Sequence, residues 1–148
     1  METLTESKYS TWYHPYKTAA AYNKKVAYFS MEFGIDQAFN NYSGGLGFLA
    51  GSHMRSGFEL KQNMIGIGML WKYGYYDQAR NDDQTLRTDF NEKYFDFLED
   101  TGIEVEVHLH DNPHVKVRAY ILKPEIFGTV PMYFLSTDVE GNDHLSRT

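Results

Sequence analysis

The apolar pattern in the first half of the chain predicts a strand, a helix and a second strand. Continuous apolar runs at residues 24–30, introduced by two lysines, and at residues 64–70 are typical of buried strands. Between them, apolar residues recur at helical spacing from Leu46, which predicts a helix that runs to about Leu60. This order is that of a β-α-β unit, in which the two strands are parallel.

The second half of the chain has a different pattern. Residues 103–110 and 115–121 alternate strictly between apolar and polar positions around a polar turn, which predicts an antiparallel hairpin with one solvated face. Residues 130–135 predict a further strand. Between the halves, residues 89–100 carry apolar side chains at helical spacing among acidic ones, so we expect a short acidic helix there that the following Thr-Gly pair ends.

These elements predict an α/β fold that lacks part of its cover. No helix follows the last predicted strand, whereas a parallel sheet needs cover on both faces, so we expect a fragment of a larger α/β domain whose exposed face invites self-association. The expected divisions are a polar N-terminal extension (1–24) and an incomplete domain (25–148), made of the β-α-β unit with its glycine turn (25–78), an acidic loop and helix (79–102), a β-rich part (103–137) and a truncated tail (138–148).

Composition narrows the function classes. The 148-residue chain has no cysteine, which removes disulfides, thiolate nucleophiles and cysteine metal sites. Its net charge of −6 comes with no basic cluster, so neither nucleic acid nor an anionic membrane surface is expected as a partner. No apolar run is long enough to span a membrane, and the expected compartment is the cytoplasm.

Candidate chemistry gathers after the first predicted strand. Gly44, Gly45, Leu46 and Gly47 lie directly before the predicted helix, where backbone N–H groups can bind an anion such as phosphate. A tight turn without a ligand is the alternative interpretation. Glu32 follows the strand and lies at the carboxyl end of the sheet, the edge at which ligands bind in open α/β sheets. The alternative for Glu32 is an ordinary acidic residue of a surface loop.

The histidines give a weaker signal. His53 falls on the apolar face of the predicted helix, so we expect a core histidine. His108 and His110 share one face of a strand and could chelate a metal with His114 or Asp111. Because that face is acidic and solvated, we favour surface residues and predict no metal site. No nucleophile-elbow, zinc-protease or Walker motif occurs.

Taken together, the segments around the glycine turn resemble a known family. Residues 26–34 (VAYFSMEFG) and 42–51 (YSGGLGFLAG) resemble the start of the α-glucan (glycogen/maltodextrin) phosphorylases, most of all their shorter bacterial and archaeal branch. The similarity continues at residues 65–70, 74–78 and 130–139, in the family's order. It therefore covers most of the chain from about residue 25 onward.

The resemblance implies the N-terminal fragment of a glycosyltransferase of the GT-B type, in which two Rossmann-like domains enclose the active site. This chain would be part of the first domain, with an antiparallel β-hairpin insertion. The implied reaction is retaining phosphorolysis of an α-1,4-glucan end by inorganic phosphate, which releases glucose 1-phosphate. Pyridoxal phosphate is carried by a lysine of the C-terminal domain. The family's glycine loop, matched here by Gly44, Gly45, Leu46 and Gly47, faces the phosphate, and Glu32 matches an acidic positioning residue at the edge of the site.

Departures from the family limit what can be transferred. Ser43 and Gly34 stand where the long, animal-type enzymes have Asn and Tyr, as in the short branch, so the role of that Tyr does not transfer. Ser52 replaces an Asp that is common in short-branch relatives. The cofactor lysine, the basic phosphate-binding residues and the catalytic-site histidine belong to downstream parts of the family, and neither Lys61 nor Lys72 matches them. We therefore expect this fragment to be inactive without its missing C-terminal domain.

Two other functions stay open at this point. A glycogen or starch synthase shares the fold type and a Gly-Gly-Leu-Gly loop, but there Lys and Thr precede the loop, whereas this chain has Tyr42 and Ser43. A non-catalytic glucan-binding module would use the aromatic residues, which make up 16% of the chain, although most of them occupy positions compatible with a core. The phosphorylase interpretation is favoured, with α-1,4-glucan and inorganic phosphate as ligands and a homo-oligomer as a possible assembly.

Overall fold

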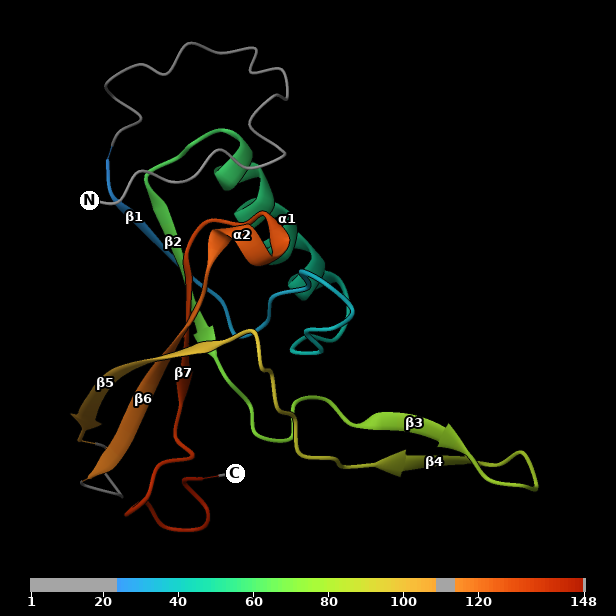
Figure 1. Cartoon of the computed structure of the whole chain (residues 1–148). Coiled ribbons are helices and arrows are strands. Elements are labelled where there is room, and N and C mark those ends of the chain that lie inside the picture. The colour runs from blue at the N-terminus through green and yellow to red at the C-terminus, as the bar shows by residue number, and fades with distance from the viewer. Residues whose placement is uncertain (1–23, 109–113, 148) are drawn as a thin grey trace.

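The computed structural model describes residues 24–108 and 114–147 (Figure 1). Its elements in chain order are β1 (Val26–Phe29), α1 (Gly45–Glu59), β2 (Met64–Met69), β3 (Asp77–Arg80), β4 (Leu86–Asp89), β5 (Glu99–Val107), β6 (Val115–Leu122), α2 (Pro124–Phe127) and β7 (Met132–Ser136). The predicted helix, the strands on either side of it and the strands of the predicted hairpin are all present. The polar extension proposed for residues 1–24 lies almost wholly outside the described residues.

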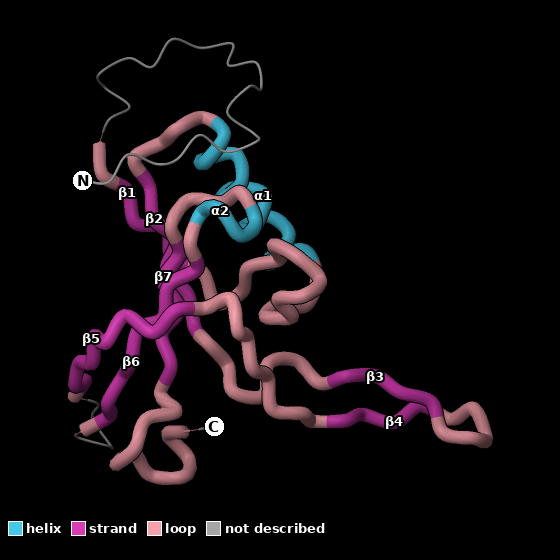
Figure 2. Tube along the Cα trace, viewed as in Figure 1, coloured by secondary structure: helices cyan, strands magenta, loops and turns pink. Residues whose placement is uncertain are grey.

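Five of the strands form one mixed sheet in the order β1-β2-β7-β6-β5 (Figure 2). β2 runs parallel to both β1 and β7, which confirms the parallel strands of the predicted β-α-β unit. β6 is antiparallel to β7 and to β5, and the pairing of β5 with β6 confirms the predicted hairpin. β3 and β4 form a separate antiparallel hairpin that extends away from the main sheet in Figure 1. The fold is therefore α/β with a mixed sheet.

The acidic helix predicted for residues 89–100 is wrong. β4 ends at Asp89, no helix occupies residues 90–98, and β5 begins at Glu99. Phe95 and Phe97 are two residues apart and both place their rings against Phe39, at centroid distances of 4.8 and 5.8 Å. Tertiary contact with Phe39 thus decides the path of this segment. The Thr-Gly pair expected to end the helix lies within β5, beside an irregularity in the pairing with β6.

The core lies between α1 and one face of the sheet. Its fully buried members come from the segment after β1, from α1, and from β6 and β7: Phe33, Phe39, Ala50, Met54, Leu122, Met132 and Phe134. The sheet approaches α1 closely, since a Cβ atom on Gly66 of β2 would lie 2.8 Å from the sulfur of Met54. Residues 24–30 do contain a strand, β1, but the prediction that this strand is buried is wrong. β1 is an edge strand of the described sheet, and Phe29 is 71% exposed.

The buried face of α1 differs from the predicted one. It consists of small residues and one methionine, Gly47, Ala50, Gly51, Met54 and Gly57. Leu46 and Leu49 are 57% and 68% exposed. His53 is exposed as well and contacts the ring of Tyr28 at 5.0 Å, so the prediction of a core histidine is wrong. The reason is the segment after β1, which packs directly on the helix backbone and leaves no room for larger side chains.

The tightest part of this contact joins Gly34 to α1. The Gly34 N–H donates a hydrogen bond to the carbonyl oxygen of Gly47 at 2.7 Å. A Cβ atom on Gly51 would lie 2.6 Å from the carbonyl carbon of Gly34, a distance that real Cβ atoms do not tolerate. Two backbones can approach this closely only where both residues lack a side chain.

We predict that Gly51→Ala destabilises the protein by about 1–3 kcal/mol, because the new methyl group forces the Gly34 segment away from α1. Urea unfolding followed by circular dichroism measures the effect. The matched control is Gly45→Ala, a second helical glycine at which an added Cβ meets nothing within 4 Å. That control should leave stability unchanged or raise it by about 0.5 kcal/mol. Equal stabilities for the two variants would contradict the packing argument.

Candidate functional site

The candidate site lies at the carboxyl end of β1, where the chain turns toward α1. The Ser30 hydroxyl donates to the carbonyl oxygen of Glu32 at 2.8 Å and accepts from the Glu32 N–H at 3.3 Å. The Ser30 N–H in turn donates to the carbonyl oxygen of Ile67 in β2 at 3.1 Å. These bonds fix the turn directly after the strand, so the position of Glu32 is tied to the sheet.

The Glu32 carboxylate joins three segments of the chain. Its Oε2 accepts a hydrogen bond from the Ser43 N–H at 3.1 Å, directly before the glycine turn. Its Oε1 accepts a hydrogen bond from the hydroxyl of Tyr75, which lies between β2 and β3. Both carboxylate oxygens are therefore engaged, and Glu32 holds the approach to α1 in place.

The same contact changes the titration of Tyr75. The hydrogen bond to Glu32 raises the pKa of the Tyr75 phenol above its ordinary value, with smaller contributions from burial and from the carboxylate charge. Removing the phenolic proton would break the bond and place two negative charges side by side. Tyr75 is thus a donor to Glu32 throughout the neutral pH range.

The glycine turn is open to solvent at its first two residues. Gly44 is the N-cap of α1, has a positive φ of 81° and provides no side chain to cap the helix. Added Cβ atoms at Gly44 and Gly45 would meet nothing within 4 Å, and Leu46 is also exposed. The N–H groups of a first helical turn have no acceptor inside the helix, and the helix dipole makes this end positive. The turn is therefore able to receive an anion.

Gly47 has a different role from the other three residues of the turn. It is buried, and a Cβ atom there would lie 2.5 Å from the Cβ of Tyr42. Its carbonyl oxygen accepts the hydrogen bond from Gly34 described above. Gly47 thus secures the turn to the segment that carries Glu32, while Gly44, Gly45 and Leu46 face the open side.

An apolar hollow of about 370 Å³ adjoins the turn. It is lined by Leu46 of α1, by Phe29 and Met31 at the end of β1, and by Ile67 and Met69 of β2. The hollow is open to solvent, so the glycine turn borders an apolar surface on this side.

The histidines do not gather into a metal site within the described ranges. No group of three or more potential ligands occurs there. The rings of His108 and His114 contact each other at 4.9 Å, and His114 Nδ1 lies 3.1 Å from a Glu106 carboxylate oxygen, all on exposed residues. His110 and Asp111, the other candidate ligands, lie outside the described residues. In the same ranges, no helix combines the length and apolar character needed to cross a bilayer.

Sequence reasoning missed Tyr75 and Trp71 as partners of the site. Tyr75 is 43 residues from Glu32, and the Trp71 indole N–H donates to the carbonyl oxygen of Met31, 40 residues away, at 3.3 Å. No local pattern marks either contact. Both residues lie in the segment between β2 and β3, and β2 is the neighbour of β1. That position was the available signal, because the carboxyl ends of parallel strands meet at one edge of a sheet.

Known proteins similar to this chain include phosphorylases. The chain is 33% identical over 147 residues to the maltodextrin phosphorylase of Thermococcus litoralis, covering 94% of this chain and 17% of that protein. It is 32% identical over 132 residues to the glycogen phosphorylase of Mycobacterium tuberculosis, covering 80% and 14%. An uncharacterized protein of Methanocaldococcus jannaschii is 50% identical over 125 residues, covering 84% and 24%.

These matches confirm the resemblance: homologues named glycogen phosphorylase and maltodextrin phosphorylase align with most of this chain. The chain spans about a quarter or less of the length of these relatives. No family model matches the sequence.

We predict that Glu32→Gln lowers the pKa of Tyr75 toward its ordinary value of about 10, because the carboxylate that holds the phenolic proton is lost. Carbon-13 NMR of ring-labelled tyrosines measures this pKa, with Tyr75→Phe to assign the resonance. Glu59→Gln, a change to another partly buried glutamate, should leave it unaltered.

The same substitution has a defined pH dependence. The folded-state pKa of Tyr75 lies above the unfolded value of about 10, so the bond stabilises the protein fully below pH 10 and is lost as pH rises through the folded-state pKa. Glu32→Gln should therefore cost about 1 kcal/mol at neutral pH, and less in strong alkali. A Tyr75 pKa that is identical in both proteins would overturn this account.

Proposed function

We propose that this chain is the N-terminal part of an α-1,4-glucan phosphorylase of the short bacterial and archaeal branch. Within it, the chain forms part of a Rossmann-like domain of the GT-B type and faces a second domain across the active site. The observation that carries the proposal is the open, uncapped start of α1 at Gly44 and Gly45, held in place by the Glu32 carboxylate through Ser43. The named homologues support the choice of reaction.

In the proposed reaction, inorganic phosphate cleaves the terminal glucose from an α-1,4-glucan. A phosphate oxygen forms a bond to C1 of that glucose, and the bond from C1 to the glucan oxygen breaks. The departing oxygen takes up the proton of the attacking hydrogen phosphate. The products are glucose 1-phosphate, with retained configuration, and a shortened glucan. Negative charge at the phosphate persists throughout, so N–H groups fixed in advance at the start of α1 stabilise it without reorganisation.

Each residue of the site has a separate role in this proposal. Gly44, Gly45 and Leu46 supply backbone N–H groups and the dipole of α1. Gly47 provides the anchor to the Gly34 segment. Glu32 is a positioning residue. Its two carboxylate oxygens accept hydrogen bonds from the Ser43 N–H and the Tyr75 hydroxyl, and so hold these groups in place.

Lys72 and Lys93 do not fit attachment of pyridoxal phosphate. In the proposed whole protein, this cofactor supplies a phosphate group for proton exchange. A lysine that forms a Schiff base must lose its proton readily. Lys72 does the opposite, because its hydrogen bond to Asp138 raises its pKa. Lys93 forms an ion pair with Asp77 at 2.7 Å. On the resemblance to the phosphorylases, we assign the cofactor lysine to a part of the protein beyond this chain and expect the chain alone to be inactive.

The test is phosphorolysis by the intact natural protein, assumed to act in the cytoplasm. Maltoheptaose and inorganic phosphate should yield glucose 1-phosphate, detected by coupled oxidation through phosphoglucomutase and glucose-6-phosphate dehydrogenase. Glucose transfer from ADP-glucose without phosphorolysis would replace the proposal with a synthase. Glucan binding without either reaction would replace it with a binding module.

We predict that Gly45→Pro lowers kcat/KM for phosphorolysis by about 10²–10³-fold, the usual cost of one lost oxyanion donor. Proline is suited to the first position of a helix and removes only the N–H group. Gly45→Ala keeps the N–H at the same place, so the ratio between the two variants isolates the donor from the effect of a side chain. Steady-state kinetics with phosphate varied gives both values. A ratio near one would show that this amide does not serve the reaction.

A further inference from the structure

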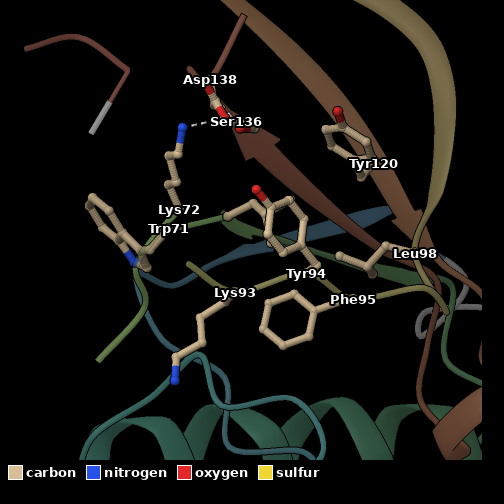
Figure 3. A pocket seen from close by; sticks show the side chains of 10 residues that line it. Trp71, Lys72, Lys93, Tyr94, Phe95, Leu98, Tyr120, Ser136 and Asp138 are labelled. Atoms are coloured by element: carbon tan, nitrogen blue, oxygen red, sulfur yellow. Dashed lines mark hydrogen bonds and ion pairs between the residues drawn. The ribbon is translucent and has the colours of Figure 1, made fainter. Parts of the chain in front are cut away.

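A second hollow lies at the carboxyl ends of β2 and β7, apart from the glycine turn (Figure 3). It has a volume of about 190 Å³. Three segments meet around it: residues 70–72 after β2, residues 93–98 before β5, and Ser136 and Asp138 at the end of β7, with Tyr120 of β6 on the remaining side. Ligands in α/β sheets bind at this edge of parallel strands. We call it the Lys72–Asp138 hollow.

One wall of the Lys72–Asp138 hollow is charged but internally neutralised. Lys72 Nζ lies 3.2 Å from Asp138 Oδ2 and 3.4 Å from Glu92 Oε1. Arg147 lies 2.7 Å from Asp138 Oδ1. Burial alone would raise the pKa of Asp138, but the hydrogen bonds and charges of Arg147 and Lys72 outweigh it, so this pKa is lowered. Asp138 therefore stays ionised at neutral pH. Lys93 also lines the hollow and pairs with Asp77 at 2.7 Å, so the cluster holds three cations and three anions.

This neutral balance restricts the class of ligand. A phosphate site needs an excess of cations, and a metal site needs several converging carboxylates without competing cations. Here each charge, Lys93 with Asp77 included, already has a partner of opposite sign. What remains available is hydrogen bonding in both directions, since carboxylate and hydroxyl oxygens accept and ammonium and guanidinium groups donate. An uncharged ligand rich in hydroxyl groups fits this wall.

The other side of the Lys72–Asp138 hollow is aromatic. Tyr94 is 83% exposed, yet its hydroxyl donates a hydrogen bond to Glu92, which fixes one end of a ring that the fold does not cover. Figure 3 shows the Tyr94 ring between the Lys72–Asp138 pair and Phe95, with Tyr120 beside it. Trp71 completes the aromatic side, and its indole N–H is held by Met31. An anchored, solvated ring offers a flat apolar face for stacking.

We propose that the Lys72–Asp138 hollow binds one uncharged hexose unit of the glucan. The C–H face of the sugar ring stacks on Tyr94, and its hydroxyl groups donate to Asp138 and Ser136 and accept from Lys72. The volume suits a single ring, being smaller than the 300–1,000 Å³ of pockets for larger ligands. The identity of the glucan rests on the proposed function, whereas the binding itself requires no phosphorolysis.

The test uses the intact protein with ring-labelled tyrosines, titrated with maltotriose in the absence of phosphate. The Tyr94 and Tyr120 resonances, assigned with Phe variants, should shift together and saturate. Inorganic phosphate alone should leave both unchanged. Tyr94→Ala should raise the maltotriose concentration at half-shift of Tyr120 by about tenfold, whereas Tyr94→Phe, which keeps the ring, should raise it by no more than about threefold. Phe90→Ala, a comparably exposed ring outside the hollow, should have no effect.

The outcomes separate this proposal from the proposed function. The hexose site is overturned if Tyr94→Ala leaves the maltotriose concentration at half-shift of Tyr120 unchanged. It is also overturned if the Tyr94 resonance responds to phosphate but not to maltotriose. Both results hold even if glucose 1-phosphate is released. Saturable maltotriose shifts that Tyr94→Ala weakens support the site even if no phosphorolysis occurs.

Discussion

The close backbone contact between Gly34 and α1 sets the geometry on which the rest of the site depends. Gly34 donates to Gly47, and the absence of a side chain at Gly51 allows the two backbones to meet. Glu32 lies two residues before this contact and the open glycine turn begins three residues before Gly47. The packing of α1 and the positions of the candidate functional groups therefore depend on the same contact. A change that pushes the helix outward would also separate Glu32 from Ser43.

The contact also explains why the buried face of α1 is poor in large apolar residues. Phe33 and Ile35, on either side of Gly34, fill the space that helix side chains would otherwise occupy, and both are buried. The core gains its apolar volume from the loop, while α1 contributes mainly its backbone surface and Met54. Burial of large side chains stabilises the fold whichever element supplies them.

The success of sequence reasoning follows the range of the interactions involved. The extent of α1 and the β5–β6 hairpin could be predicted because their periodicity is local. The conformation of residues 89–100 could not be predicted, because Phe95 and Phe97 pack against Phe39, which lies more than fifty positions earlier in the chain. His53 was misplaced because helical spacing identifies a face but not which side chains the opposing segment leaves room for. The hydrogen bonds of Glu32 to Ser43, directly before the glycine turn, and to Tyr75 needed coordinates, because no local pattern marks them.

The proposed phosphate site has an electrostatic requirement that the described residues do not meet alone. Glu32 is an anion beside the turn that would receive another anion, and among the residues that the structure describes no lysine or arginine pairs with it. Its two hydrogen bonds disperse that charge but do not cancel it. The start of α1 contributes only partial positive charge. A phosphate held there therefore needs cations from outside the described residues, and this need gives a physical reason for the proposed placement of the active site between two domains.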